Sequence, residues 1–168
     1  MLVLGIAWIM ASRAPTAAAA NSLRAAPRVG FSAPDLRALS PSGESLSLGQ
    51  WRGQVVVLNF WATWCGPCRA EMPALQSLYN AHQGDGLIVL GINQLEDAET
   101  AAGFLRALQL NFPVGLDRDG AIGARYQIRA LPTTFFIDRN GVIQDVVYGG
   151  PMDAALLQSK VTALLAKP

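Results

Sequence analysis

Cysteine and histidine are scarce in this sequence, whose 168 residues include two cysteines and one histidine. Two cysteines are too few for a disulfide-stabilised scaffold, and the four Cys or His ligands of a typical structural zinc site are not present. Charged residues are also few, at 15% of the chain, against roughly 25% in an average soluble domain. The 13 Lys and Arg and the 12 Asp and Glu give a net charge of +1 without a basic cluster. We therefore expect no nucleic-acid partner and no electrostatic docking to membranes, because both need a basic surface.

Apolar residues are abundant instead. They make up 51% of the chain, and the mean hydropathy of +0.27 excludes an intrinsically disordered protein. A chain of this length can bury a sizeable core as one domain and is short for two. From residue 28 onward the sequence has no internal repeat and no low-complexity tract, so we expect one folded domain over residues 28–168.

The first 27 residues differ from the rest and predict export. An apolar run, Leu2–Ala11, is followed by Ala17–Ala20, which is typical of a signal peptide ending in an A-x-A cleavage site. The run is about half of the ~20 apolar residues that cross a bilayer, and it lacks the preceding basic residues of a signal peptide. We interpret residues 1–27 as the remnant of a signal peptide or membrane anchor plus a linker, and expect more of it upstream. Cleavage after Ala20 and a permanent membrane tether both stay open, and the alternative is an apolar arm of a cytosolic protein.

Hydrophobic patterning predicts alternating strands and helices after the linker. Val55–Phe60 and Leu87–Ile92 are continuously apolar, typical of strands buried on both faces with parallel neighbours, and the segment between them has helical spacing. Asn140-Gly141 predicts a tight turn with positive φ angles between two antiparallel strands. The expected strands are 36–39 and 44–48, which form an N-terminal hairpin, then 55–60, 87–92, one near Val114, 133–137 and 142–148, and the expected helices are 67–81, one starting after Asp97, and 153–165. This order predicts an α/β fold with a central mixed sheet flanked by helices.

The motif Trp64-Cys65-Gly66-Pro67-Cys68 lies directly after one predicted strand and begins the helix after it. Free backbone N–H groups and the helix dipole stabilise an anion at a helix N-terminus, so Cys65 is expected to be a nucleophilic thiolate. Cys68, one turn further, can attack a mixed disulfide on Cys65, which releases reduced substrate and leaves a Cys65–Cys68 disulfide. Gly66 suits the turn, and Pro67 suits the first helical turn because no needed N–H is lost there.

The segment Asn59–Pro73 strongly resembles the thioredoxin superfamily, and within it the exported TlpA/ResA-like branch. The resemblance extends over most of the chain after Val29, including Leu131-Pro132-Thr133-Thr134. It implies a thioredoxin-like fold with an N-terminal β-hairpin and a central insertion. It also implies that Pro132 is a cis-proline facing the CxxC motif, and that the backbone of Leu131 pairs with an extended substrate. The residues assigned to the substrate-binding surface are Trp64, Gly66, Pro67, Leu131 and Pro132.

Proton transfer needs a further group beside the cysteines. Thioredoxins carry a buried Asp on the strand before the motif, whereas this chain has Asn59, which cannot titrate. By resemblance, Glu96 in the inserted segment Asn93–Asp97 is the active-site glutamate, and it would exchange a proton with Cys68. The alternative is that Glu96 is a solvated charge at the start of the next helix, which Asp97 is expected to cap. Glu71 also resembles a family feature, but we interpret it as an exposed helical charge.

The resemblance implies a thiol-disulfide oxidoreductase that works outside the cytoplasm of a bacterium, with no cofactor beyond the Cys65–Cys68 pair. It would reduce disulfides in exported proteins, with apocytochrome c before haem attachment as one such substrate. Electrons would come from a transmembrane thiol reductant of the CcdA or DsbD type. Gly66-Pro67 resembles the motif of reducing thioredoxins rather than that of strong oxidants. We expect a monomer.

Other functions fit the residues less well. A copper-binding or copper-site-assembly chaperone of the Sco type resembles C-x-x-x-C plus a distal His, whereas this chain has C-x-x-C. A peroxidatic redoxin needs P-x-x-x-T-x-x-C, and Ala62 stands where Thr is required. A zinc site would need a second Cys pair, and His82 lies well past the motif, so no metal is expected. A non-catalytic binding module would have no use for intact Cys65, Cys68 and Pro132.

Overall fold

The computed structural model describes residues 24–167, so the predicted signal or anchor segment, with its cleavage site after Ala20, lies outside this range. The strands are β1 (Arg37–Leu39), β2 (Ser45–Ser47), β3 (Val55–Trp61), β4 (Leu87–Gln94), β5 (Val114–Asp117), β6 (Thr133–Ile137) and β7 (Ile143–Tyr148). The helices are α2 (Gly66–His82), α3 (Ala98–Ala107), α4 (Ala121–Arg125) and α5 (Ala154–Leu165), with short 3-10 turns η1 (Leu48–Trp51) and η2 (Gln83–Asp85).

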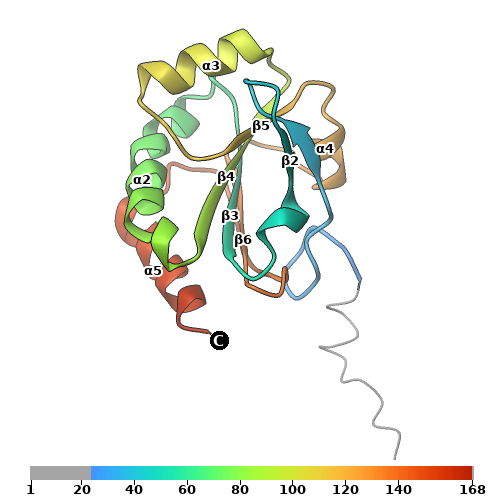
Figure 1. The fold of residues 1–168 in the computed structure, drawn as a ribbon, viewed down its shortest axis with the longest axis vertical. Helices are drawn as coiled ribbons and strands as arrows, with labels where there is room; N and C mark the ends of the chain where they lie inside the picture. The colour runs from blue at the N-terminus through green and yellow to red at the C-terminus, as the bar shows by residue number, and fades with distance from the viewer. Residues whose placement is uncertain (1–23, 168) are drawn as a thin grey trace, which may run out of the picture.

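The seven strands form one mixed sheet in the order β2-β1-β5-β4-β3-β6-β7 (Figure 1). β3 is an inner strand, parallel to β4 on one side and antiparallel to β6 on the other. All seven residues of β3 are buried, which agrees with its continuous apolar run. The predicted mixed sheet, the hairpin of β1 and β2, and the antiparallel pairing of β6 with β7 are confirmed.

Each face of the sheet carries its own hydrophobic core. The helical-side core lies under α2 and α5 and contains both cysteines, with the partly buried Phe104 and Leu105 of α3 packed against it. The hairpin-side core lies on the opposite face, under the N-terminal segment, η1 and α4. It includes the buried Trp51 of η1. Figure 1 shows α2 and α5 together on one side of the sheet and α4 on the other.

Local signals explain where the helices begin. α2 starts at Gly66 with proline in its first positions, as expected from Pro67. The Asp97 carboxylate caps α3 by accepting a hydrogen bond from Thr100 N at 2.8 Å, which confirms the predicted cap. This hydrogen bond also lowers the pKa of the exposed Asp97 carboxyl below its usual value. Asp153 caps α5 in the same way through Leu156 N.

The turn between β6 and β7 differs from the prediction. Gly141 has a φ of +77°, whereas Asn140 is not among the residues with positive φ. Gly141 N donates to Asp138 O, and the Asp138 carboxylate accepts from Asn140 N and Val142 N. The Asp138 side chain therefore organises the turn, and only one residue in it needs the left-handed conformation.

The helix α4 was not predicted from the sequence. Its five residues are too few for a periodic pattern, and its N-cap is Gly120 rather than a polar side chain. The buried Asp117 at the end of β5 holds it instead, because its carboxylate accepts from Ile122 N at 3.0 Å and Gly123 N at 2.7 Å. Because the capping carboxylate comes from a residue before the N-cap position, the usual sequence signal, a Ser, Thr, Asp or Asn at the N-cap itself, is missing.

Contacts with the domain begin slightly before residue 28. Ala26 N donates to Ser32 O, and Ser32 N donates to Arg24 O. The division of the chain at residue 27 stays a prediction.

Candidate active site

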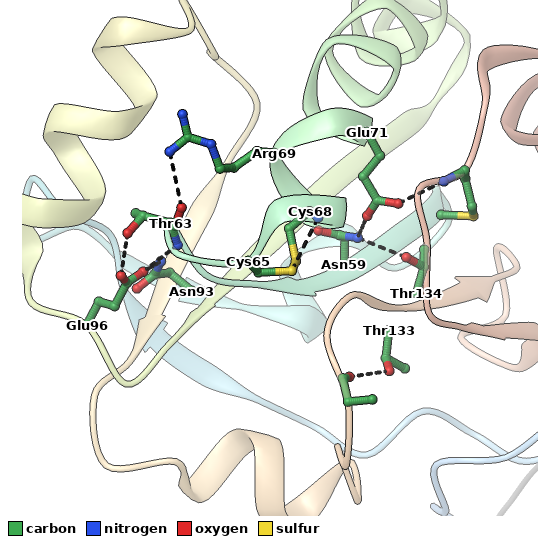
Figure 2. Close-up of a disulfide and its surroundings, with 12 residues drawn as sticks. Asn59, Thr63, Cys65, Cys68, Arg69, Glu71, Asn93, Glu96, Thr133 and Thr134 are labelled. Atoms are coloured by element: carbon green, nitrogen blue, oxygen red, sulfur yellow. Dashed lines mark hydrogen bonds between the residues drawn. A yellow bond between two sulfur atoms is a disulfide. The ribbon is translucent and has the colours of Figure 1, made fainter.

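Cys65 and Cys68 form a disulfide at the start of α2, with their Cα atoms 5.2 Å apart (Figure 2). Cys65 is the N-cap residue, and its Sγ accepts a hydrogen bond from Cys68 N at 3.2 Å. Cys65 is 4% exposed and Cys68 is fully buried. Of the two sulfurs, Cys65 is therefore the nearer to the surface, and its position at the helix N-terminus favours a thiolate after reduction.

Three of the predicted substrate-binding residues lie next to the cysteines in the sequence and are exposed. Trp64 is 70% exposed, and Gly66 and Pro67 are exposed as well, so they form an accessible rim. Trp61, by contrast, is fully buried in the helical-side core, where its ring packs against Phe104.

The peptide bond between Leu131 and Pro132 is cis, as the resemblance implied. Leu131 is half-buried and packs against the core that contains both cysteines. The pairing of β6 with β7 begins only at Thr133, so Leu131 lies outside this ladder. A residue at this position can offer its backbone to an extended segment of another chain.

Glu96 lies between β4 and α3, and its carboxylate has three donors. Thr63 N and Thr63 Oγ1 lie 2.9 Å and 2.5 Å from its two oxygens, and Asn93 Nδ2 lies 2.6 Å from one of them (Figure 2). Glu96 is half-buried and is therefore not the solvated charge of the alternative interpretation. Its bonds fix the turn two residues before Cys65. Whether it exchanges a proton with Cys68 stays a prediction.

Glu71 is not the exposed helical charge expected from the sequence. It is fully buried, one turn after Cys68 on α2. Its Oε1 accepts from Asn59 Nδ2 at 2.8 Å and its Oε2 accepts from Met152 N at 3.0 Å (Figure 2). Burial raises the pKa of Glu71 above the usual carboxyl value, and these two hydrogen bonds offset part of that rise.

A sequence signal for the burial of Glu71 did exist. Cys68, Glu71, Met72, Leu75 and Leu78 recur at helical spacing, and all five are buried on one face of α2. Because Glu71 falls in this apolar series, periodicity alone places it on the inner face. The interpretation from charge type was wrong because it set that spacing aside.

Gly150 shows how closely the chain packs around Glu71. A Cβ atom at this position would lie 2.6 Å from Pro132 Cγ and 2.8 Å from Glu71 Oε2. The Gly150–Pro151 peptide bond is also cis, and Met152 follows it with the N–H that reaches Glu71. The loop before α5 thus joins the cis-Pro132 segment to the buried carboxylate.

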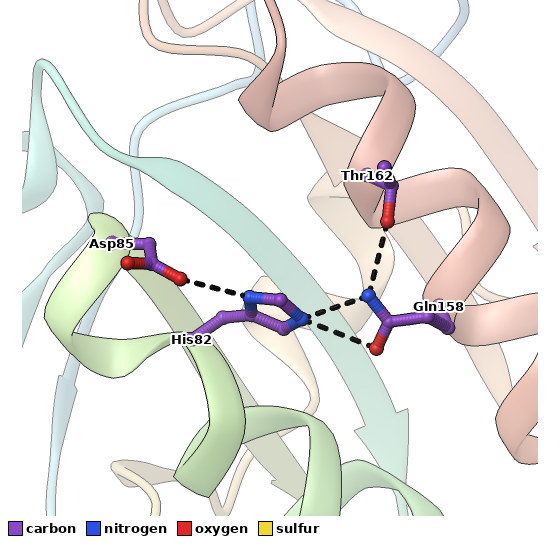
Figure 3. Close-up of polar contacts among 4 residues, drawn as sticks. All are labelled: His82, Asp85, Gln158 and Thr162. Atoms are coloured by element: carbon purple, nitrogen blue, oxygen red, sulfur yellow. Dashed lines mark hydrogen bonds and ion pairs between the residues drawn. The ribbon is translucent and has the colours of Figure 1, made fainter.

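His82 lies at the far end of α2, roughly 20 Å along the helix from the cysteines at 1.5 Å per residue. Its Nδ1 pairs with Asp85 at 3.0 Å, and its Nε2 contacts the Gln158 amide of α5 (Figure 3). His82 therefore ties α2 to α5 and does not meet the CxxC motif. Within residues 24–167, no group of three or more His, Cys, Asp or Glu side chains is placed to hold a metal ion.

Comparison with known proteins identifies the family to which the chain belongs. The model of the AhpC/TSA family matches residues 29–146, which is most of the chain. The chain belongs to the AhpC/TSA family. It is 37% identical over 121 residues to thiol-disulfide oxidoreductase ResA of Geobacillus kaustophilus, which covers 72% of this chain and 70% of that protein.

Two further comparisons agree with the likeness to ResA. The thioredoxin-like protein YneN of Bacillus subtilis is 43% identical over 124 residues, covering 71% of each chain. The crystal structure of a thiol:disulfide interchange protein of the thioredoxin family from Chlorobium tepidum aligns with a TM-score of 0.73 at 26% identity, covering 80% of this chain and 96% of that one. With the CxxC disulfide at the helix start, these likenesses confirm the thioredoxin-like fold and make this family member a thiol-disulfide oxidoreductase.

Proposed function

We propose that this oxidoreductase reduces disulfides in exported proteins, with Cys65 as the attacking thiolate and Cys68 as the resolving one. The observation that carries the proposal is the N-cap position of the Cys65 sulfur, which accepts the Cys68 N–H at 3.2 Å. The reduced Cys65 thiolate attacks one sulfur of a substrate disulfide and releases the other as a thiolate. Cys68 then attacks the Cys65 sulfur, which releases the second substrate thiolate and passes two electrons to the substrate.

The direct test is reduction of insulin disulfides by the purified protein with dithiothreitol as the electron source. We expect the protein to accelerate insulin precipitation over dithiothreitol alone. A wild-type protein that matches the background rate, with its disulfide shown to be reduced, would overturn the proposal.

We propose that the Glu71 carboxylate exchanges a proton with the Cys68 thiol. Residues three apart on a helix lie on the same face, about 5–6 Å between Cβ atoms, which puts Glu71 beside Cys68. Because burial raises its pKa, the Glu71 carboxylate is a stronger base than an exposed carboxylate. Before Cys68 attacks the mixed disulfide, Glu71 takes the thiol proton. Glu96 would contribute from the Thr63 side of the motif.

Replacing Glu96 by glutamine is expected to slow insulin reduction by one to two orders of magnitude, the low end of the ~10²–10⁴-fold range of general acid–base catalysis. Glutamine keeps one acceptor but turns an NH₂ group toward the Thr63 or Asn93 donors that the carboxylate binds. Rates and thiol titrations should be measured from about pH 5 to about pH 9. Asp97→Asn is the matched control and should change little, because Asp97 only caps α3. Wild-type rates and titrations for Glu96→Gln would show that Glu96 takes no part in proton transfer and only holds the Thr63 turn.

The site of action is proposed to lie outside the cytoplasm, in the periplasm or on the outer face of the cytoplasmic membrane. Support comes from the apolar segment before Pro27 and from the fact that disulfides persist in exported proteins but not among reduced cytosolic thiols. Apocytochrome c before haem attachment is the proposed substrate, and a CcdA- or DsbD-type protein the proposed electron donor. Within residues 24–167, no helix has the length and apolar character to cross a bilayer.

A reporter that is active only after export, fused after Pro168, tests this location. We expect signal from the full chain expressed from its natural start, and none when residues 1–23 are deleted. If neither fusion gives a signal, the protein stays in the cytoplasm, and exported proteins are not its substrates.

A further inference from the structure

Asn59 lies in β3, and its side-chain amide is fully buried. Both side-chain hydrogen bonds of Asn59 are donated by its Nδ2 atom. Its Nδ2 donates to Glu71 Oε1 at 2.8 Å and to Thr134 Oγ1 at 2.9 Å. Its Oδ1 is buried and has no hydrogen-bond partner within the described part of the chain. Figure 2 shows the amide lying between the cysteine pair and the Glu71 carboxylate.

The orientation of this amide is set by Glu71. Turning the amide over would aim Oδ1 at the carboxylate, oxygen against oxygen, and would lose a hydrogen bond to a charged acceptor. The observed orientation leaves Oδ1 unsatisfied, which costs stability in a buried site. A leucine, which has the same branching and no polar atoms, would avoid that cost. We conclude that the role of the Asn59 amide at this position is to donate a hydrogen bond to Glu71.

Within residues 24–167, Glu71 forms no ion pair. Met152 N is its second donor, and burial is the largest cause of its raised pKa. Of the charged residues on neighbouring elements, Asp153 caps α5, and Lys160 pairs with Asp145 of β7. β3 and β6 carry no charged side chain, and Cys68, once reduced, is the titratable group on the same face of α2.

We propose that Asn59 is a positioning residue that orients the Glu71 carboxylate beside Cys68 and keeps it ionised for proton transfer. This rests on the proposed role of Glu71 as the proton acceptor. Asn59 thus stands where thioredoxins have a carboxylate, but it acts through a carboxylate supplied by α2. Removing its donor should raise the pKa of Glu71, because the Asn59 hydrogen bond lowers it.

The test is a ¹³C NMR titration of the Glu71 side-chain carboxyl in the full, reduced protein. Asn59→Leu is expected to move the midpoint upward. Asn59→Asp, which is nearly isosteric, should move it further, because two carboxylates at hydrogen-bond distance share a proton. Thr134→Val is the matched control: it removes the other partner of Asn59 Nδ2 at a similar distance and should leave the Glu71 midpoint in place.

The rate of insulin reduction provides a second readout. On the acid limb of the pH–rate profile, the rate at a fixed pH should fall about tenfold for each pH unit that the Glu71 midpoint rises. The rate should recover to the wild-type value at higher pH. In a Glu71→Gln background, Asn59→Leu should no longer move the limb. A wild-type midpoint in both Asn59 variants, or an equal rise in Thr134→Val, would overturn the inference. A wild-type protein that reduces no insulin would instead overturn the proposed function, and the NMR titration would still decide the role of Asn59.

Discussion

Cys65→Ser is expected to abolish disulfide reduction, with a loss of about a thousandfold or more, because removal of a covalent nucleophile leaves only binding. Serine retains the size and the N-cap acceptor of Cys65, so α2 should still begin at Gly66. Its hydroxyl stays protonated at neutral pH and does not attack sulfur. The loss should appear in insulin reduction under conditions where the thermal unfolding midpoint confirms a folded protein.

The assignment of Cys65 rests on exposure as well as charge. Both sulfurs belong to the helical-side core, but Cys65 is 4% exposed and Cys68 is fully buried. A Cys65→Ala protein that still forms mixed disulfides through Cys68 would contradict the assignment. In that case the buried sulfur would be the reactive one, and α2 would have to open before each reaction.

Cys68→Ala is expected to convert the enzyme into a trap. The attack by Cys65 remains, because the N–H that stabilises its sulfur belongs to the backbone of residue 68 and survives the substitution. Resolution is lost, since no second thiol lies within reach, and the chain has only two cysteines. Turnover should fall to the rate at which external thiol releases the adduct.

The trapped species is measured as a covalent adduct by mass spectrometry and on non-reducing gels. Cys65→Ser/Cys68→Ala is the matched control and should yield no adduct. Rapid turnover by Cys68→Ala without added thiol would show that Cys68 does not resolve the mixed disulfide.

Much of the fold could be predicted because its signals are local. Continuous apolar runs marked β3 and β4, and Asp97 marked the start of α3. The chemistry of Cys65 followed from its place between a strand and a helix, which is also a local property.

What the sequence concealed depends on contacts between distant segments. Glu71 is satisfied by Met152, 81 positions further along the chain, and no spacing in the sequence indicates that partnership. α4 is a local case: Asp117 lies only five positions before Ile122, but the five-residue helix is too short to show a periodic pattern. Gly150 meets Pro132 and Glu71 only after three separate segments have folded together, so the reason for a glycine there appears only in three dimensions.

The separation of the two cores has a practical consequence for engineering. Both sulfurs lie in the helical-side core, whereas Trp51, Tyr126 and Ile143 lie in the hairpin-side core on the opposite face of the sheet. Leu131 packs against both cores, but distant sites that share no contacts contribute to stability almost independently. Substitutions in the hairpin-side core away from Leu131 can therefore raise thermal stability without changing the redox behaviour of the cysteine pair. Stability and redox behaviour can then be engineered in separate steps.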